Sequence, residues 1–218
     1  YEMRAGNFSY VKADDIPDTV ALFPLSAALL LPGGQMPLNI FEPRYLAMID
    51  HALGSNRLVG MVQPSLTGEV SGLCEVGCLG RITTFAETGD GRYHITLTGV
   101  CRYRILEEIN VRTPWRQAKI APMLTDLEEP KGGEIDRTAL LKAFRSFLEA
   151  NGMETDWESV NRADNVTLVN ALSMMSPYGP AEKQALLEAT DLKARAETLV
   201  AITEIMLARH GENGSTLQ

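Results

Sequence analysis

Cysteine, histidine and long apolar runs are scarce in this chain of 218 residues, which has three cysteines and three histidines. So few cysteines, odd in number and accompanied by nine methionines, favour a reducing compartment over a disulfide framework. The most apolar stretch near the N-terminus, residues 20–31, is too short to cross a bilayer. It also contains Pro24 and follows acidic rather than basic residues, unlike a signal peptide. These features predict a cytoplasmic protein without a membrane partner.

A phosphate-binding loop for ATP is also missing. No run of the form G-x-x-x-x-G-K-[ST] occurs in the sequence. The glycine clusters Gly33-Gly34 and Gly89-Asp90-Gly91 have no Lys-Ser or Lys-Thr behind them, and therefore predict turns. We expect neither ATP hydrolysis nor a bound cofactor.

The cysteines are the candidates for a metal centre or a thiol nucleophile. Cys74 and Cys78 have the spacing of two zinc ligands, and Cys101 with His94 would complete a set of four. Only one pair is close in sequence, however, and cysteine more often serves as a small buried apolar side chain. We therefore predict no metal site. A thiol hydrolase that pairs a cysteine with a histidine is retained as a third alternative for the function.

The charge is negative and unevenly distributed. Twenty Lys and Arg residues oppose 28 Asp and Glu residues, for a net charge of −8, and most of the excess lies after residue 120. Nucleic-acid binding depends on clustered positive charge, so this composition disfavours it. The arginines of the first 120 residues keep RNA binding open as the second alternative.

The first half of the chain has a mainly β pattern between residues 16 and 122. Short apolar runs, such as residues 58–62, alternate with turn signals, of which residues 88–91 are the clearest. One helix is predicted to begin at Pro43, because proline is well suited to a first helical turn and an apolar stripe follows it. Several short strands with regular turns predict a small, partly closed β-barrel with one inserted helix.

The second half has helical periodicity. Residues 123–134, with acidic runs, Pro130 and two glycines, predict a linker, and residues 135–211 predict a helical bundle that ends at a Gly211 cap. The polar residues 1–15 predict a flexible arm, and residues 212–218 predict a disordered tail. The fold class is therefore α+β, a β-barrel followed by helices.

Several motifs occur in an order that resembles one known family, the N-terminal substrate-binding domain of Lon proteases. The resemblance covers roughly residues 16–209. Its first part lies in Phe23-Pro24-Leu25, Pro32-Gly33 and Phe41-Glu42-Pro43-Arg44-Tyr45, and its second part in Glu182-Lys183-Gln184 followed by Arg195. The resemblance implies a PUA-like fold for the β subdomain and a helical subdomain after it.

The resemblance also implies a function. It suggests a non-enzymatic module that recognises unfolded or damaged polypeptides and works with a protease or ATPase partner. Neither a Walker A motif nor the serine motif of the Ser–Lys dyad found in Lon is present, so we expect a stand-alone domain. The predicted partner-binding residues are Phe41, Glu42, Arg44 and Tyr45. A mainly structural role is predicted for the remaining motif residues, which are Phe23, Pro24, Leu25, Pro32, Gly33, Pro43, Glu182, Lys183 and Gln184. The client and the oligomeric state do not follow from the sequence.

Overall fold

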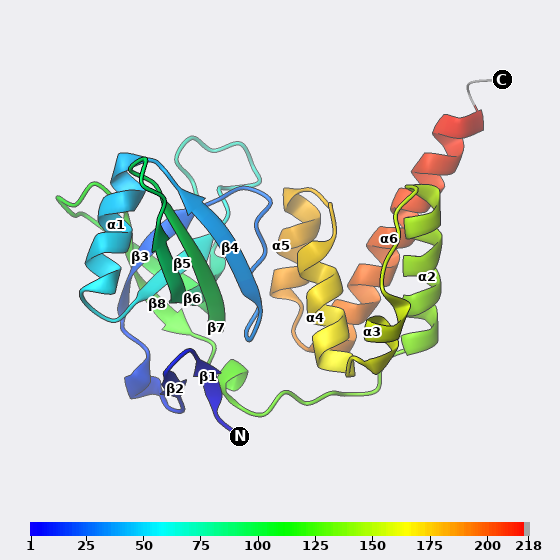
Figure 1. Cartoon of the computed structure of the whole chain (residues 1–218), viewed down its shortest axis with the longest axis horizontal. Coiled ribbons are helices and arrows are strands. Elements are labelled where there is room, and N and C mark those ends of the chain that lie inside the picture. Colours follow the sequence, from blue (N-terminus) through cyan, green and yellow to red (C-terminus); the bar gives the residue numbers. More distant parts are fainter. Residues whose placement is uncertain (216–218) are drawn as a thin grey trace. The chain divides into compact units, whose positions relative to one another are not determined.

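The computed structural model describes residues 1–215, which form two compact units (Figure 1). The first unit consists of residues 1–130 together with residues 179–181, and the second of residues 131–178 and 182 onward. All the strands described belong to the first unit, whereas the second is helical. The structure is thus of mixed α and β content, as the sequence predicts.

A six-stranded sheet forms the centre of the first unit, with the strand order β4-β7-β6-β5-β3-β8 (Figure 1). Strands β3 and β5 are parallel, and the other pairs are antiparallel. The long strand β7 also pairs with β8 through its second half, so the pairings lead from β7 through β6, β5, β3 and β8 back to β7. The strands are β3 (Thr19–Pro24), β4 (Gln35–Ile40), β5 (Leu58–Val62), β6 (Val76–Glu87), β7 (Tyr93–Ile109) and β8 (Gln117–Pro122).

Helix α1 (Pro43–Leu53) lies between β4 and β5 in the chain, with Pro43 at its first turn, which confirms the predicted inserted helix. Strand β5 coincides with the predicted residues 58–62. The predicted turn at residues 88–91 connects β6 to β7.

A buried tyrosine requires glycine in the core of this unit. The Tyr103 hydroxyl donates to the Met61 carbonyl over 3.0 Å. A Cβ atom on Gly77 would lie 2.2 Å from that carbonyl oxygen and 2.5 Å from the Tyr103 hydroxyl. No side chain fits at such distances. Glycine at position 77 therefore allows β5, β6 and the Tyr103 side chain to pack together.

The predicted flexible arm at residues 1–15 is wrong. Residues 1–15 form β1 (Met3–Ala5), β2 (Phe8–Tyr10) and the short helix η1 (Ala13–Asp15). Met3, Ala5 and Tyr10 are buried in the core of the first unit. The reversal between the two strands is made at Gly6, whose φ of +59° suits glycine. Two strands of three residues are too short for periodicity to reveal.

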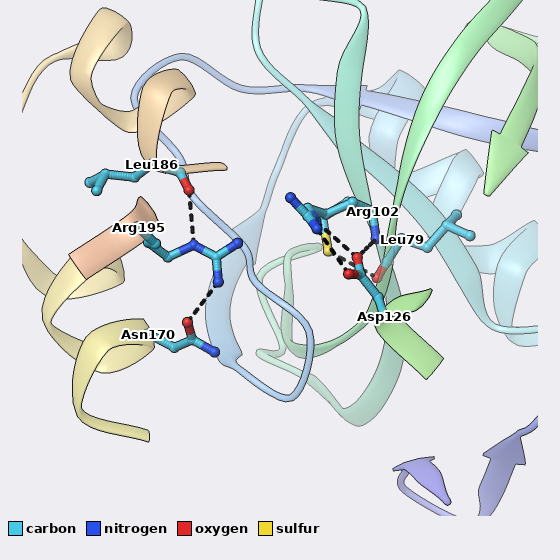
Figure 2. Close-up of polar contacts among 7 residues, drawn as sticks. Leu79, Arg102, Asp126, Asn170, Leu186 and Arg195 are labelled. Atoms are coloured by element: carbon cyan, nitrogen blue, oxygen red, sulfur yellow. Dashed lines mark hydrogen bonds and ion pairs between the residues drawn. The ribbon is translucent and has the colours of Figure 1, made fainter. Parts of the chain in front are cut away.

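Part of the predicted linker also folds onto the first unit. Residues 124–127 form the short helix η2 (Leu124–Leu127), in which Leu127 is buried. Asp126 accepts from Arg102 Nε over 2.9 Å and from Arg102 Nη2 over 3.0 Å, as Figure 2 shows. The Arg102 main-chain N–H also donates to Asp126. The division between the units, after Pro130, falls inside the predicted linker.

The second unit contains helices α2 to α6, and α6 runs alongside α2 (Figure 1). Four aspartates, Asp136, Asp156, Asp164 and Asp191, accept hydrogen bonds from main-chain N–H groups at helix N-termini. Part of the acidic excess of this half of the sequence is therefore explained by helix capping. The helices are α2 (Arg137–Ala150), α3 (Trp157–Arg162), α4 (Asn165–Met175), α5 (Pro180–Glu188) and α6 (Leu192–Ser215).

Helix α6 continues through Gly211, so the predicted end at this residue is wrong. A glycine within a helix costs about 1 kcal/mol relative to alanine, which weakens a helix without ending it. Residues 212–215 are helical rather than a disordered tail, and residues 216–218 lie outside the described residues. Across residues 1–215, no helix has both the length and the apolar character that crossing a membrane requires.

Two buried basic side chains connect the helices of the second unit. Lys183 Nζ, on α5, donates to the carbonyls of Ser173 and Met174 at the end of α4, over 2.8 and 2.9 Å. Arg195 Nε, on α6, donates to the Leu186 carbonyl in α5 over 2.9 Å (Figure 2). The last carbonyls of a helix have no partner within it, so each basic side chain stabilises the end of the preceding helix.

Candidate functional site

The start of α1 holds the residues predicted to bind a partner. Glu42 has an extended conformation before the helix, and its carbonyl accepts from the Tyr45 main-chain N–H over 2.9 Å. Its carboxylate accepts from Arg44 Nε over 3.0 Å. Both side chains are about half exposed, so this ion pair adds little stability, but it restrains the Arg44 guanidinium.

Tyr45 is 8% exposed and is held by two groups on its ring. The Phe23 ring stacks on it at 4.6 Å between centroids, with an interplanar angle of 17°. The Arg44 guanidinium lies 4.6 Å from the Tyr45 centroid. Burial raises the pKa of Tyr45, so its hydroxyl stays protonated at neutral pH.

A cleft of about 300 Å³ opens beside Tyr45. Four segments of the first unit border it: the end of β3, the start of α1, the loop of residues 64–73 between β5 and β6, and residues 114–116 before β8. Its apolar wall consists of Leu22, Pro24, Pro64, Leu73, Pro114 and Trp115, and its charged side chains are Arg44, Glu69 and Arg116. This volume lies at the lower end of the range for ligand pockets.

Arg116 attaches the loop to the strands. Its Nε and Nη2 donate to the Glu108 carboxylate over 2.5 and 2.7 Å, and Nη2 also donates to the Ser71 carbonyl over 2.8 Å. The hydrogen bond from Arg116 lowers the pKa of Glu108. Arg116 thus fixes one edge of the cleft across a long separation in sequence.

The same loop carries exposed apolar side chains. Val70, between the cleft residues Glu69 and Ser71, is 92% exposed, and Leu66 is also exposed. Exposed apolar side chains next to a cleft are typical of surfaces that contact other molecules. The loop and the cleft together therefore form the candidate site.

The predicted residues are only partly brought together. Arg44 and Tyr45 line the cleft, but Phe41 and Glu42 do not belong to its lining. Phe41 is 60% exposed, and its ring lies 5.9 Å from the Arg92 guanidinium. The loop, Trp115 and Arg116 were not among the predicted residues. For the loop, the available signal was the pair of apolar residues Leu66 and Val70 in a segment with turn residues on both sides.

The other motif residues lie mostly in structural positions. Phe23 supports Tyr45, Pro24 lines the cleft, and the Leu25 main-chain N–H donates to the Val62 carbonyl over 2.9 Å. Gly33 follows Pro32 in a turn with a φ of +78°, and its N–H donates to the Gly99 carbonyl. In the second unit Lys183 and Gln184 are buried, while Glu182 is half-buried.

A second, shallower depression of about 420 Å³ lies over β4, β6 and β7. Strand β4 pairs with β7 on one side only, so it is an edge of the sheet. Pro37 lies in the middle of this strand and has no N–H to offer to an added strand. The edge is therefore a poorer template for pairing than an uninterrupted strand.

None of the three cysteines belongs to the cleft lining. Cys78 and Cys101 are buried, and burial raises the pKa of Cys101 to about 12, so its thiol is not ionised at neutral pH. Cys74 is half-buried, and its Sγ donates to the Pro64 carbonyl. Within the described part of the chain, no three His, Cys, Asp or Glu side chains are grouped so that they could hold a metal.

Comparison with known sequences agrees with the motif resemblance. A family model described as "ATP-dependent protease La (LON) substrate-binding domain" matches residues 19–204. Lon protease 2 of Myxococcus xanthus is 25% identical over 204 residues, and the Lon protease of Parabacteroides distasonis is 28% identical over 202 residues. These alignments cover 88% and 87% of this chain. The chain spans about a quarter of the length of these relatives, since 24% of each is covered.

Comparison with solved structures shows the same fold. The Lon N-terminal domain protein from Xanthomonas campestris superposes with a TM-score of 0.62 at 22% identity, covering 84% of this chain and 97% of that one. The N-terminal domain of a Mycobacterium avium complex Lon protease gives a TM-score of 0.60 at 19% identity, covering 85% and 98%. Because the family model also matches most of the sequence, the chain belongs to the LON substrate-binding domain family.

Proposed function

We propose that this chain is a non-catalytic module that recognises unfolded or damaged polypeptide. The observation that carries the proposal is the family match over residues 19–204, because the matching model is described as the substrate-binding part of a protease. The substrates of a protease are polypeptides. The relatives are Lon proteases about four times as long as the matched part, and the family model is described as part of an ATP-dependent protease. The partner that we propose is therefore a protease or an ATPase.

The candidate site supports this proposal. An extended polypeptide presents apolar side chains and main-chain polar groups at short intervals, and the site combines an apolar wall with exposed Leu66 and Val70. The circuit of strand pairings supports a small PUA-like barrel as the scaffold that carries the loop and α1. Binding at such a site changes no covalent bond.

The test is binding of a reduced, carboxymethylated protein carrying a fluorescent label, with the same protein in its native form as the control. We expect anisotropy to rise with the unfolded form only. Val70→Asp places a charge on the exposed loop and should weaken binding by roughly tenfold, about 1.4 kcal/mol.

Val11→Asp is the matched control, because Val11 is also exposed but lies outside the loop of residues 64–73 and outside the cleft lining. It should change the affinity less than twofold. If both variants weakened binding equally, the loop would not be part of the binding site. If the unaltered chain did not bind the unfolded protein, the proposed function would be overturned.

A further inference from the structure

Three hydrogen-bond donors of the tyrosine and arginine side chains at the cleft have no acceptor within residues 1–215. One is the Tyr45 hydroxyl, and the other two are the Nη1 groups of Arg44 and Arg116, whose remaining nitrogens bond to Glu42, Glu108 and Ser71. Tyr45 is more than nine-tenths buried, and its side chain borders the cleft. Since no other side chain of the described residues accepts from them, these donors are available to a ligand that brings an acceptor into the cleft.

The donors are held in place before any ligand arrives. The Tyr45 ring is restrained by Phe23 and by the Arg44 guanidinium. Glu42 restrains Arg44, while Glu108 and the Ser71 carbonyl restrain Arg116. A ligand that binds here does not have to order these side chains, which favours affinity.

The charges of the cleft select the kind of acceptor. Arg44 and Arg116 are each paired with a glutamate, and Glu69 adds a negative charge to the lining, so the cleft has no large positive field for a polyanion. Two guanidinium groups and a hydroxyl in one small cleft nevertheless suit a single carboxylate, whose two oxygens accept several hydrogen bonds. The apolar wall of Leu73, Pro114 and Trp115 lies in the same small cleft, so the carboxylate must be close to an apolar group.

The C-terminal residue of a polypeptide meets both requirements. Its carboxylate and its side chain are attached to the same Cα atom, so both fit in one small cleft. A side-chain carboxylate within an extended chain has its apolar neighbours on the opposite face, because successive side chains alternate. Capture of a terminal carboxylate is also a recurring mode of peptide recognition.

We propose that the cleft captures the C-terminal carboxylate of a polypeptide whose last residue is apolar. Tyr45, Arg44 and Arg116 donate to the carboxylate, and the apolar wall contacts the last side chain. The preceding residues of the bound chain then run along the loop that carries Val70. This inference rests on the proposed function, because it names the part of a polypeptide that the site takes.

The test compares two labelled ten-residue peptides that end in Phe-Leu, one with a free carboxylate and one with a C-terminal amide. Anisotropy titrations use the full chain at pH 7. We expect the free acid to bind at least tenfold more tightly, because the amide lacks the charge and one acceptor oxygen. Tyr45→Phe keeps the stacked ring but removes the hydroxyl, and should weaken the acid by roughly three- to tenfold while leaving the amide unchanged.

Tyr93→Phe is the matched control. It removes a hydroxyl that donates to Asp50 over 2.7 Å and does not line the cleft. It should leave the affinity for both peptides unchanged. Because Tyr93→Phe leaves the cleft intact, it distinguishes loss of the Tyr45 hydroxyl from a general effect of replacing a tyrosine.

The outcomes separate this inference from the proposed function. Equal binding of acid and amide, or equal weakening of both by Tyr45→Phe, would overturn terminal capture, and unfolded protein would then still bind. If N-acetyl-leucine bound as tightly as the acid peptide, the occupant would be a small apolar carboxylate, which also overturns the inference. If unfolded protein failed to bind as well, both proposals would fall together.

Discussion

The two units use buried basic side chains in different ways. In the first unit Arg102 meets a carboxylate, that of Asp126, and the two side chains are 9% and 11% exposed. In the second unit Lys183, which is 3% exposed, donates to two main-chain carbonyls. The first arrangement joins η2 to β7, and the second joins α5 to the end of α4.

The difference follows from what each architecture leaves unsatisfied. A sheet pairs its main-chain groups between strands, so a segment outside the sheet, such as η2, needs a side-chain contact to be held. A helix leaves its last carbonyls without a partner, and a neutral carbonyl can be satisfied by one cation from the next helix. Ion pairing in one unit and helix capping in the other should therefore respond differently to mutation and to pH.

The largest expected effect tests the ion pair. Asp126→Ala leaves Arg102 buried beside Cys101 and Cys78 without its carboxylate, which typically costs about 3–5 kcal/mol. The chain has two tryptophans, Trp115 in the first unit and Trp157 in the second. Urea unfolding of single-tryptophan variants therefore reports on each unit, and the Trp115 transition should shift far more than the Trp157 transition.

Glu75→Ala is the control for this prediction. It removes the partner of Arg104 in the same unit, but those side chains are 49% and 77% exposed. Exposed pairs contribute about 0–1 kcal/mol, so the Trp115 transition should hardly move. Equal shifts of the two tryptophan transitions with Asp126→Ala would show that the two units do not differ as the comparison requires.

Local features of the fold were accessible from the sequence. Helix α1 and strand β5 were predicted because Pro43 and the apolar spacing act within a few residues. The hairpin β1–β2 was missed because each strand has only three residues and its stability comes from burial of Met3 and Tyr10 against distant strands. The predicted end of the last helix at Gly211 was wrong because a single glycine weakens a helix without ending it.

The candidate site was harder to predict from the sequence than the fold. Arg44 and Tyr45 were predicted from their motif, but Arg116 reaches Ser71 across 45 residues, and no local period encodes that contact. Phe41 and Arg44 are three residues apart, yet only Arg44 borders the cleft, because Phe41 precedes the helix that orients its neighbours. A cleft built from four segments becomes visible only when the strands that carry or flank them are paired.

A second way to sharpen the comparison is alkaline pH. Burial lowers the pKa of Lys183 to about 8 from an unfolded value near 10.5, so the unfolded chain binds more protons between these values. Stability of the second unit should therefore rise with pH from about 8 to 10, by about 1–2 kcal/mol. Burial raises the pKa of Cys101 to about 12 from 9.0, so the unfolded chain binds fewer protons above pH 9, and the first unit should lose stability there.

The measurement is the urea midpoint of each tryptophan transition at several pH values between 7.5 and 10. Lys183→Met should abolish the rise in the second unit, whereas Lys142→Met, which replaces an exposed lysine on α2, should leave it intact. If the urea midpoints of the two transitions changed with pH in the same direction, the prediction that the two units respond oppositely to pH would be wrong.

The smallest expected effect concerns the aspartates of the second unit. The Asp164 carboxylate accepts from the Thr167 main-chain N–H over 2.8 Å at the start of α4, the helix whose other end Lys183 stabilises. Asp164→Ala should destabilise the second unit by about 1 kcal/mol, and Asp164→Asn by less, since asparagine also caps helices. Hydrogen bonding to Thr167 lowers the pKa of Asp164, so the capping contribution should be present above the unfolded pKa near 3.8 and be lost as the pH falls through the lower folded value. In the Trp157 transition, Asp164→Ala should therefore differ from the unaltered chain at pH 7 and approach it at pH 3.

Glu154→Ala is the control, because Glu154 is an exposed residue outside the helices. Its urea midpoint should show no such convergence with the unaltered chain as the pH falls. If Asp164→Ala differed from the unaltered chain equally at pH 7 and pH 3, its effect would come from packing instead of capping.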